Sequence, residues 1–230
     1  MMKGFLMRNS VKNLRTARFA VAAFVFLLSV FSVARWLKES NLKENALSDM
    51  TLEELWTLFP IFLVEHTDKW AEDFKAIDSL LRALLADFPL HRISHIGSTA
   101  IEGIWAKDIV DVLVEVGANA DLNAMARLMA QHGFMIMSAN AKRISLNRGY
   151  TEEGFADRVY HIHLRNTGDN DELYFRDYLN DHPDAAKAYE ALKLDLWKRY
   201  PHDRDAYTEA KTAFVREYTD KGRLQYGARY

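Results

Sequence analysis

The chain has 230 residues, of which 49% are hydrophobic and 27% charged, and this composition predicts a globular protein with a sizeable core. The absence of cysteine excludes disulfide frameworks, thiolate zinc sites and thiol nucleophiles, and the lack of an internal repeat excludes a solenoid. The formal net charge is −2, but residues 1–38 carry seven basic and no acidic residues, so the remainder carries −9. Such an acidic body disfavours nonspecific nucleic-acid binding, and the partner to expect is a small molecule.

An apolar segment at residues 19–34 follows this basic stretch and has three interpretations. A membrane anchor would be short, since the segment falls below the ~20 residues that span a bilayer. A signal peptide would have its apolar core at residues 19–31, with Ser32 and Ala34 as small residues before the cleavage site. In the third interpretation, Met50 opens the working protein. We predict that residues 1–49 are an extension and that the protein is cytoplasmic, or membrane-anchored if residues 19–34 are an anchor.

The first elements after this extension are mainly helical. A short helix is expected at residues 51–58, because Thr51 can cap it and two acidic residues follow in its first turn. Residues 61–65 are typical of a strand. An amphipathic helix is predicted at residues 68–88, where seven apolar residues recur at helical spacing: Trp70, Phe74, Ile77, Leu81, Leu84, Leu85 and Phe88.

Strands and helices then alternate before the chain becomes helical. The pattern predicts strands at residues 92–96, 109–116, 134–138, 143–147 and 159–165 and one further helix at residues 119–132. The first two strands are expected to be neighbours in the sheet. Three last helices are predicted at residues 169–180, 183–200 and 203–221. We therefore predict an α+β fold in which a mixed sheet with flanking helices (residues 50–168) is followed by a C-terminal helical part (residues 169–230) packed on that core.

The segment HIGSTAIEGIWAKDIVDVLVE, at residues 95–115, carries the candidate chemistry. Gly97 and Ser98 follow a strand, where a glycine lets a phosphate approach backbone N–H groups closely. The hydroxyl groups of Ser98 and Thr99 would be further donors. A Gly-Ser pair also occurs in ordinary turns, so this signal needs support from other residues.

That support comes from an acidic strand about a dozen residues later. Asp111, Leu113 and Glu115 share one face of this strand, and the residues between them are apolar enough for a buried strand. A carboxylate in such a place costs free energy unless it binds something.

Five longer motifs extend the pattern: HIGSTA (95–100), AKDIVDVLVEV (106–116), YHIHLRN (160–166), YFRDYLNDHPDAAKAYEALK (174–193) and RYPHDRDAYTEAKTAFV (199–215). Together they resemble the GrpB-like proteins, a branch of the nucleotidyltransferase superfamily, from about residue 52 to residue 223. The resemblance implies a nucleotidyltransferase-like sheet, a Gly-Ser pair for nucleotide phosphates, an Asp-x-Asp strand that holds Mg²⁺ and a third acid on a later strand. Gly97, Ser98 and Asp111 match this pattern, whereas Leu113 occupies the place of the second acid.

The departure at Leu113 changes the expected metal site. Residues two apart on a strand are ~6.6 Å apart and can serve metals ~3.5–4 Å apart, but Glu115 lies ~13 Å from Asp111 and cannot replace the missing acid without a bulge. The later strand offers His161 and His163 instead. Asp111, His161 and His163 are therefore the candidate metal ligands, and Asp111 and His163 the candidate catalytic residues. Such ligands suit Zn²⁺, Mn²⁺ or Fe²⁺ better than Mg²⁺, although the alternation of the strand also fits a solvated face or substrate contacts.

Basic residues provide candidate phosphate ligands. Four of them could line a phosphate site or could be solvated surface charges: Lys107, Arg143, Arg148 and Arg158. Lys211 lies one helical turn after Tyr207, and the resemblance makes it a plausible phosphate contact. Phe214 and Tyr218 continue the same stripe, however, and fit simple packing.

Two functions follow from these residues. The first is an enzyme that transfers a nucleotidyl group to a small acceptor, with Gly97 and Ser98 at the phosphates, Asp111 on the metal and Lys211 or Arg148 on the triphosphate. The second is an inactive nucleotidyltransferase-like fold that serves as a ligand-binding or interaction module, which the missing second acid favours. Both predict a nucleotide or another phosphorylated small molecule as the partner, and the first needs a divalent metal, Mg, Mn or Zn.

Overall fold

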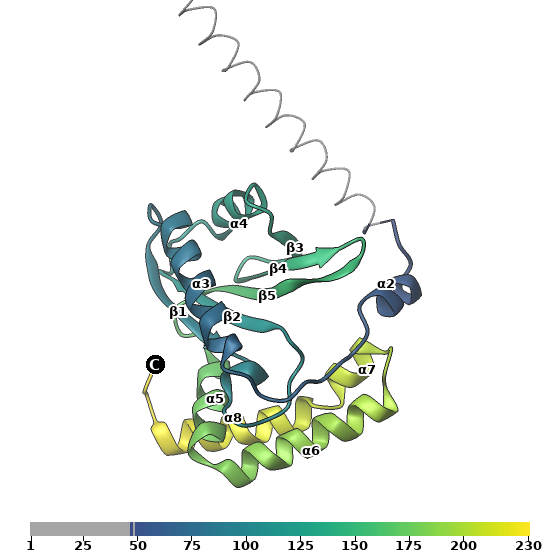
Figure 1. Cartoon of the computed structure of the whole chain (residues 1–230). Helices are drawn as coiled ribbons and strands as arrows, with labels where there is room; N and C mark the ends of the chain where they lie inside the picture. The colour runs from purple at the N-terminus through teal and green to yellow at the C-terminus, as the bar shows by residue number, and fades with distance from the viewer. Residues whose placement is uncertain (1–46, 48) are drawn as a thin grey trace, which may run out of the picture. The chain divides into compact units, whose positions relative to one another are not determined.

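A computed structural model of the chain describes residue 47 and residues 49–230 (Figure 1). The anchor and signal-peptide interpretations concern residues 19–34, which lie outside the described residues. The chain divides into two units, Met1–Asp49 and Met50–Tyr230, and the description below concerns the second. Among the described residues, no helix combines the length and the apolar character that a bilayer crossing requires.

Residues 50–230 form a five-stranded mixed sheet with helices against its faces, which confirms the predicted α+β fold (Figure 1). The elements in chain order are α2 (Leu52–Leu58), α3 (Lys69–Leu84), β1 (Leu90–Ile96), the 3₁₀ turn η1 (Ser98–Ala100), β2 (Val110–Val116), α4 (Leu122–Ala130), β3 (Met135–Ala139), β4 (Arg143–Thr151), β5 (Gly154–Asn166), α5 (Asp171–Asp181), α6 (Pro183–Arg199), α7 (Arg204–Glu209) and α8 (Thr212–Tyr226).

The sheet has the strand order β1-β2-β5-β4-β3. Strands β1 and β2 are antiparallel neighbours, as predicted, while β2 and β5 run parallel. This parallel pair sets Asp111 beside His161 and Leu113 beside His163. The register therefore brings together, on one sheet face, two segments that are 50 residues apart in the sequence.

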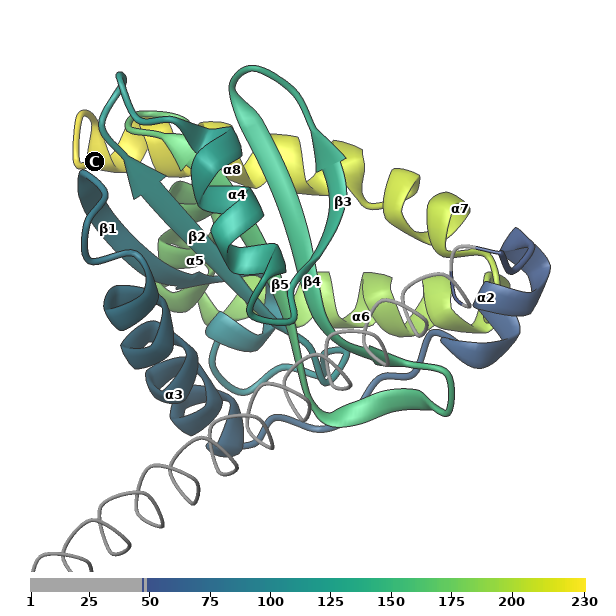
Figure 2. The same cartoon turned by 90° about the horizontal axis from the view of Figure 1, so that it is seen from above.

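The alternation of β2 assigns its residues to two different environments. The valines at positions 110, 112, 114 and 116 join the main core with α3 and α4, and Figure 2 shows α4 over this side of the sheet. Residues 111, 113 and 115 face the C-terminal helices on the other side. There Leu113 packs with Ile96 and with Leu173 of α5. The second-acid position is thus filled by a core side chain.

Two predicted elements differ from the structure. Residues 61–65 do not form a strand, because only Val64 makes a bridge, to Ala106, while Ile61 and Leu63 are buried in an extended loop. The helix predicted at residues 203–221 is divided into α7 and α8 near Lys211. This division matters below, because it places Lys211 at the start of α8 rather than within a helix.

Candidate functional site

A cavity of about 510 Å³ opens where β2 begins, between the sheet, α2 and the C-terminal helices. Several of the predicted site residues line it, together with residues that the sequence did not single out. Its polar and charged lining residues include Ser98, Lys107, Asp111, Asn147, His161, Lys193, Arg204, Tyr207 and Lys211, and its apolar lining residues include Leu52, Leu55, Trp56 and Met137.

Gly97 allows the end of β1 to pass directly over Asp111. Its φ of 72° lies in the region that favours glycine, and a Cβ added there would lie 2.3 Å from Asp111 Oδ2. The following Ser98 begins the 3₁₀ turn and lines the cavity. The predicted Gly-Ser pair is therefore a place where the backbone approaches the Asp111 carboxylate closely, next to a cavity.

Asp111 is surrounded by imidazoles. Its Oδ1 lies 3.3 Å from His161 Nδ1 and 3.5 Å from His163 Nε2. Burial would raise the pKa of Asp111, but the hydrogen bonds and charges of the two histidines outweigh burial, so the pKa is lowered overall. The carboxylate is therefore ionised at neutral pH.

A hydrogen-bonded chain orients His161. The Arg204 guanidinium donates to the Tyr150 hydroxyl at 3.1 Å, and that hydroxyl lies 2.8 Å from His161 Nε2. With Tyr150 donating to Nε2, the other ring nitrogen carries the proton and faces Asp111. The opposite tautomer would leave Nδ1 and Asp111 as two facing acceptors. The ring of His161 is thus fixed by one partner on each side.

Three lysines line the cavity and give it positive charge. The Nζ atoms of Lys107 and Lys211 lie 5.1 Å and 4.4 Å from the ring centre of Tyr207. Burial lowers the pKa of Lys107 to about 7, with help from the charges of Lys211 and Arg204. Burial also lowers the pKa of Lys211 to about 8. Loss of solvent around a charged amine is the common cause of both shifts, and both side chains are half-buried.

Lys193 is the third lysine, and it was not among the residues predicted from the sequence. Its side chain is 1% exposed and donates to the Trp105 carbonyl, and burial lowers its pKa to about 7, with the charge of Lys211 acting in the same direction. A signal for it existed, because Lys193 interrupts the buried stripe of α6 formed by Ala186, Tyr189 and Leu196. A lysine at an apolar position of a helix indicates a buried cation.

Some predicted phosphate ligands lie elsewhere. The Thr99 hydroxyl donates to the Ile109 carbonyl and contacts His95, so it is already satisfied away from the cavity. Arg148 is next to Asn147 on β4 and points to the opposite sheet face, with its guanidinium 5.2 Å from the Phe134 ring centre. Arg148 points away from the cavity because successive side chains along a strand alternate between the two faces of the sheet.

Two other basic candidates are engaged in ion pairs. Arg143 pairs with Asp169 through two hydrogen bonds of 2.6 Å, and Arg158 pairs with the buried Asp73 at 2.9 Å. Each pair links two segments that are distant in the sequence, and neither arginine lines the cavity.

The cluster around Asp111 does not match a two-metal centre. Such a centre needs carboxylates that bridge two ions, but Leu113 stands in the place of the second acid and is fully buried. Glu115 is also committed, since its oxygens accept from Arg92 and Asn170. Within the part of the chain that the structure describes, no group of three or more acidic or histidine side chains is arranged to hold a metal ion. The predicted metal ligands therefore lie together, with the two imidazole rings next to the Asp111 carboxylate.

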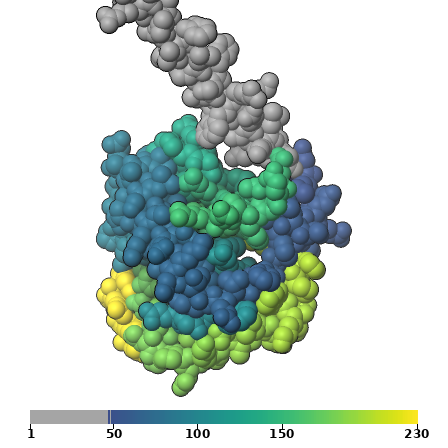
Figure 3. Space-filling view, viewed as in Figure 1, coloured from purple at the N-terminus to yellow at the C-terminus, as the bar shows by residue number. Residues whose placement is uncertain are grey.

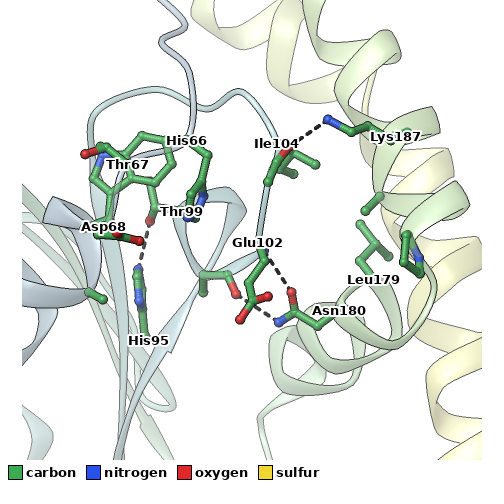
Figure 4. A pocket seen from close by; sticks show the side chains of 16 residues that line it. His66, Thr67, Asp68, His95, Thr99, Glu102, Ile104, Leu179, Asn180 and Lys187 are labelled. Carbon is green, nitrogen blue, oxygen red and sulfur yellow. Dashed lines mark hydrogen bonds between the residues drawn. The ribbon is translucent and has the colours of Figure 1, made fainter.

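A second cavity, of about 740 Å³, lies on the far side of η1 (Figure 4). His95 and Thr99 meet in it at 2.9 Å, and Asn180 closes one side by bonding to the backbone of Glu102 and Ala100. Ser98 and Thr99, adjacent in the sequence, thus face two different cavities. Lys107, Lys193 and Lys211 line the cavity of Ser98, whereas Lys187 lines the second cavity.

Comparisons with known proteins agree with the sequence motifs. A family profile described as GrpB protein matches residues 60–221. The Glutamate-rich protein GrpB of Alkalihalophilus pseudofirmus is 32% identical over 163 residues, which cover 68% of this chain and 92% of that protein. A UPF0157 protein of Pseudomonas aeruginosa is 34% identical over 64% of this chain and 61% of its own length. The crystal structure of a conserved GrpB protein from Enterococcus faecalis superposes with a TM-score of 0.63 and 24% identity over 72% of this chain and 99% of that chain.

Proposed function

This chain belongs to the GrpB family, and we propose that its basic cavity binds the phosphate groups of a nucleotide. The observation that carries the proposal is the convergence of Lys107, Lys193 and Lys211 on one cavity. Among the described residues, none of these three lysines forms an ion pair with a carboxylate. Lys193 is buried and Lys107 and Lys211 are half-buried, so holding their charges together costs free energy. A bound polyphosphate would supply directly paired counterions.

The remaining residues of the cavity support the same proposal. Arg204 adds a fourth cation, and the Ser98 hydroxyl and the backbone of the Gly97 turn add hydrogen-bond donors. Asp111 is the exception, since a carboxylate repels phosphate. Its Oδ1 lies 3.3 Å from His161 Nδ1 and 3.5 Å from His163 Nε2, and hydrogen bonds from the two rings reduce that repulsion.

The geometry favours nucleotide binding over nucleotidyl transfer as the function of the cavity. Metal-dependent nucleotidyl transfer needs carboxylates at the ions, and Asp111 is the one acid that the cavity offers next to Ser98. Transfer of a nucleotidyl group to a small acceptor is therefore the second candidate function. The position of Asp111 beside the Gly-Ser turn favours it, and a divalent metal would be required.

A titration of the full chain with tripolyphosphate and with ATP tests the proposal. Calorimetry would give the dissociation constant, and at ~100 times that concentration ligand should stabilise the fold by about 2.7 kcal/mol. The titrations are repeated with Mg²⁺, Mn²⁺ and Zn²⁺, and pyrophosphate release is followed to test transfer.

Lys193→Met is the informative variant and Lys198→Met its control, because Lys198 is exposed on the same helix. We expect Lys193→Met to weaken tripolyphosphate binding at least tenfold and to leave the melting temperature unchanged or higher, since a buried cation is removed. Lys198→Met should change neither quantity. Absence of any polyphosphate or nucleotide response, with or without metal, would contradict the proposal, and rapid pyrophosphate release would promote transfer to the main function.

A further inference from the structure

Part of the lining of this cavity is apolar and incompletely covered. Leu52, Leu55 and Trp56 of α2 belong to it, and none of the residues of α2 is buried. Met137 of β3 lines the same cavity. Leu52 is 63% exposed and Met137 is 57% exposed, which is unusual for large apolar side chains that lie this close to a cavity. The space-filling view shows the surface hollowed beside this part of the chain (Figure 3).

Helix α2 is capped internally at its start and anchored to the protein at its end. Thr51 and Glu54 form a reciprocal capping box at its first turn, within the helix itself. At its other end Phe59 is buried and contacts the rings of Tyr150 and Phe155, at 4.8 Å and 5.0 Å. The same Tyr150 hydroxyl bonds to His161. Leu52 is exposed and Leu55 and Trp56 are half-buried, so the apolar side of α2 is only partly covered beside the cavity.

The two walls require a ligand with two different ends. One end must be anionic, to meet the lysines, and the other must be a flat or apolar group that can cover Trp56 and its neighbours. A nucleotide has this division, because its phosphates are charged and its base is a π-system that stacks on aromatic side chains. A free inorganic polyphosphate would use only the basic wall.

We infer that Leu52, Leu55, Trp56 and Met137 form the base-binding wall of this cavity, an inference that rests on the proposed function. The family match begins at residue 60, so the three residues of α2 lie before the matched region and Met137 lies within it. The wall is a specificity element beside the phosphate site.

Binding of ATP is compared with binding of tripolyphosphate for the full chain and for Trp56→Ala and Met137→Ala. We expect ATP to bind the unaltered chain at least tenfold more tightly than tripolyphosphate. Each substitution should weaken ATP at least fivefold and leave tripolyphosphate within twofold. Leu224→Ala is the control, because Leu224 is 87% exposed on α8 and does not line the cavity. Unchanged melting temperatures would show that the variants fold.

The outcomes separate this inference from the proposed function. If the unaltered chain binds both ligands equally, or if the substitutions weaken both ligands equally, the base-binding wall is overturned while the phosphate site stands. If tripolyphosphate and ATP both fail to bind, the proposed function is overturned and the wall with it. A preference for ATP that survives both Trp56→Ala and Met137→Ala would place the base elsewhere in the cavity and would also overturn the inference.

Discussion

The absence of a side chain at Gly97 allows the backbone to approach Asp111 closely in the candidate site. Two effects forbid a side chain at position 97, namely the φ of 72° and the approach of the Asp111 carboxylate. Gly103 shares the first effect, with a φ of 69°, but a Cβ added to it would have no neighbour within 4 Å. The two glycines thus allow backbone strain to be separated from contact with Asp111.

We predict that Gly97→Ala lowers the free energy of unfolding more than Gly103→Ala does. Strain alone should cost each variant ~1–3 kcal/mol, and the displaced carboxylate should add to the cost at position 97. Urea denaturation measures both values. Equal losses would mean that Asp111 simply moves aside, and the close approach would then have no structural consequence.

Leu113 decides whether the second acid can be restored. The side chain is fully buried against Ile96 and Leu173. An aspartate at this position would lose this packing and would bury an uncompensated charge, which typically costs ~3–5 kcal/mol. We therefore predict that Leu113→Asp is strongly destabilised and releases no more pyrophosphate than the unaltered chain.

The matched control for this substitution is Leu113→Met, which keeps the volume and should cost less than ~1.5 kcal/mol. Urea denaturation and a pyrophosphate assay are run on both variants. A stable Leu113→Asp protein that gains pyrophosphate release would show that one ligand was the only missing part of a transferase site.

At the scale of elements, amphipathic helices and neighbouring strands could be predicted from the sequence, because burial of one face leaves a periodic pattern. The stripe of residues 68–88 is an example, with Trp70, Ile77, Leu81 and Leu85 buried as expected. The break between α7 and α8 could not be predicted, since residues 203–221 contain no proline and their apolar residues continue at helical spacing. The break between α7 and α8 depends on tertiary contacts of Tyr207, which is 1% exposed. Local helix propensity carries no information about such contacts.

The candidate site was predictable only in part for a similar reason. Asp111, His161 and His163 could be grouped because two strands of alternating residues can be aligned, and the structure does bring them together. The lysine wall depends on how α6, α7 and α8 meet the sheet. Lys107, Lys193 and Lys211 come from three separate segments, and no local pattern states that they converge.

Glu115 links β1, β2 and α5, and this link supplies a prediction at the element scale. Its side chain is fully buried and accepts from Arg92 at 2.6 Å and from Asn170 at 3.0 Å. Arg92→Met should leave the carboxylate without its cation and lower the free energy of unfolding by ~3–5 kcal/mol. Arg82→Met is the control, because Arg82 pairs with Asp78 at the exposed surface, where ion pairs are worth ~0–1 kcal/mol.

Chemical denaturation of both arginine variants measures these losses. A small loss for Arg92→Met would mean that Asn170 and water satisfy Glu115 without its cation. In that case Glu115 would be less firmly committed to the scaffold than the hydrogen bonds indicate.

At the scale of the whole molecule, the charges of the cavity oppose the charge of the body. The chain after residue 38 carries −9, yet four cations and only two acids, Asp111 and Asp205, line the cavity. A net negative charge repels extended polyanions, whereas a cavity lined by four cations attracts one small anion. The net charge thus favours a single phosphorylated ligand over a nucleic-acid chain.

The same lysines predict a pH dependence with opposite signs for stability and binding. In the folded protein the pKa is about 7 for Lys107 and Lys193 and about 8 for Lys211, against 10.5 for an ordinary lysine. Between pH 7 and about 9.5 the unfolded chain therefore holds more protons at these groups than the folded chain does. Their contribution to the free energy of unfolding must then rise with pH, since the penalty of burying charged amines disappears as they lose their protons. Asp111 acts on Lys211 and has a lowered pKa, so it stays ionised throughout this range and does not change the sign.

We predict that Lys193→Met is more stable than the unaltered chain at pH 6 and that the difference narrows by pH 9.5. Comparing the two proteins removes the general effect of growing negative charge on the body. Tripolyphosphate binding to the unaltered chain should weaken at least tenfold from pH 6.5 to pH 9.5, because the amines lose the charge that attracts it, even though the ligand itself becomes more negative in this range. Urea denaturation and calorimetry at matched ionic strength measure both trends. A stability difference that stays constant with pH, together with binding that strengthens toward pH 9.5, would show that the lysines remain charged and are solvated rather than held in a site for an anion.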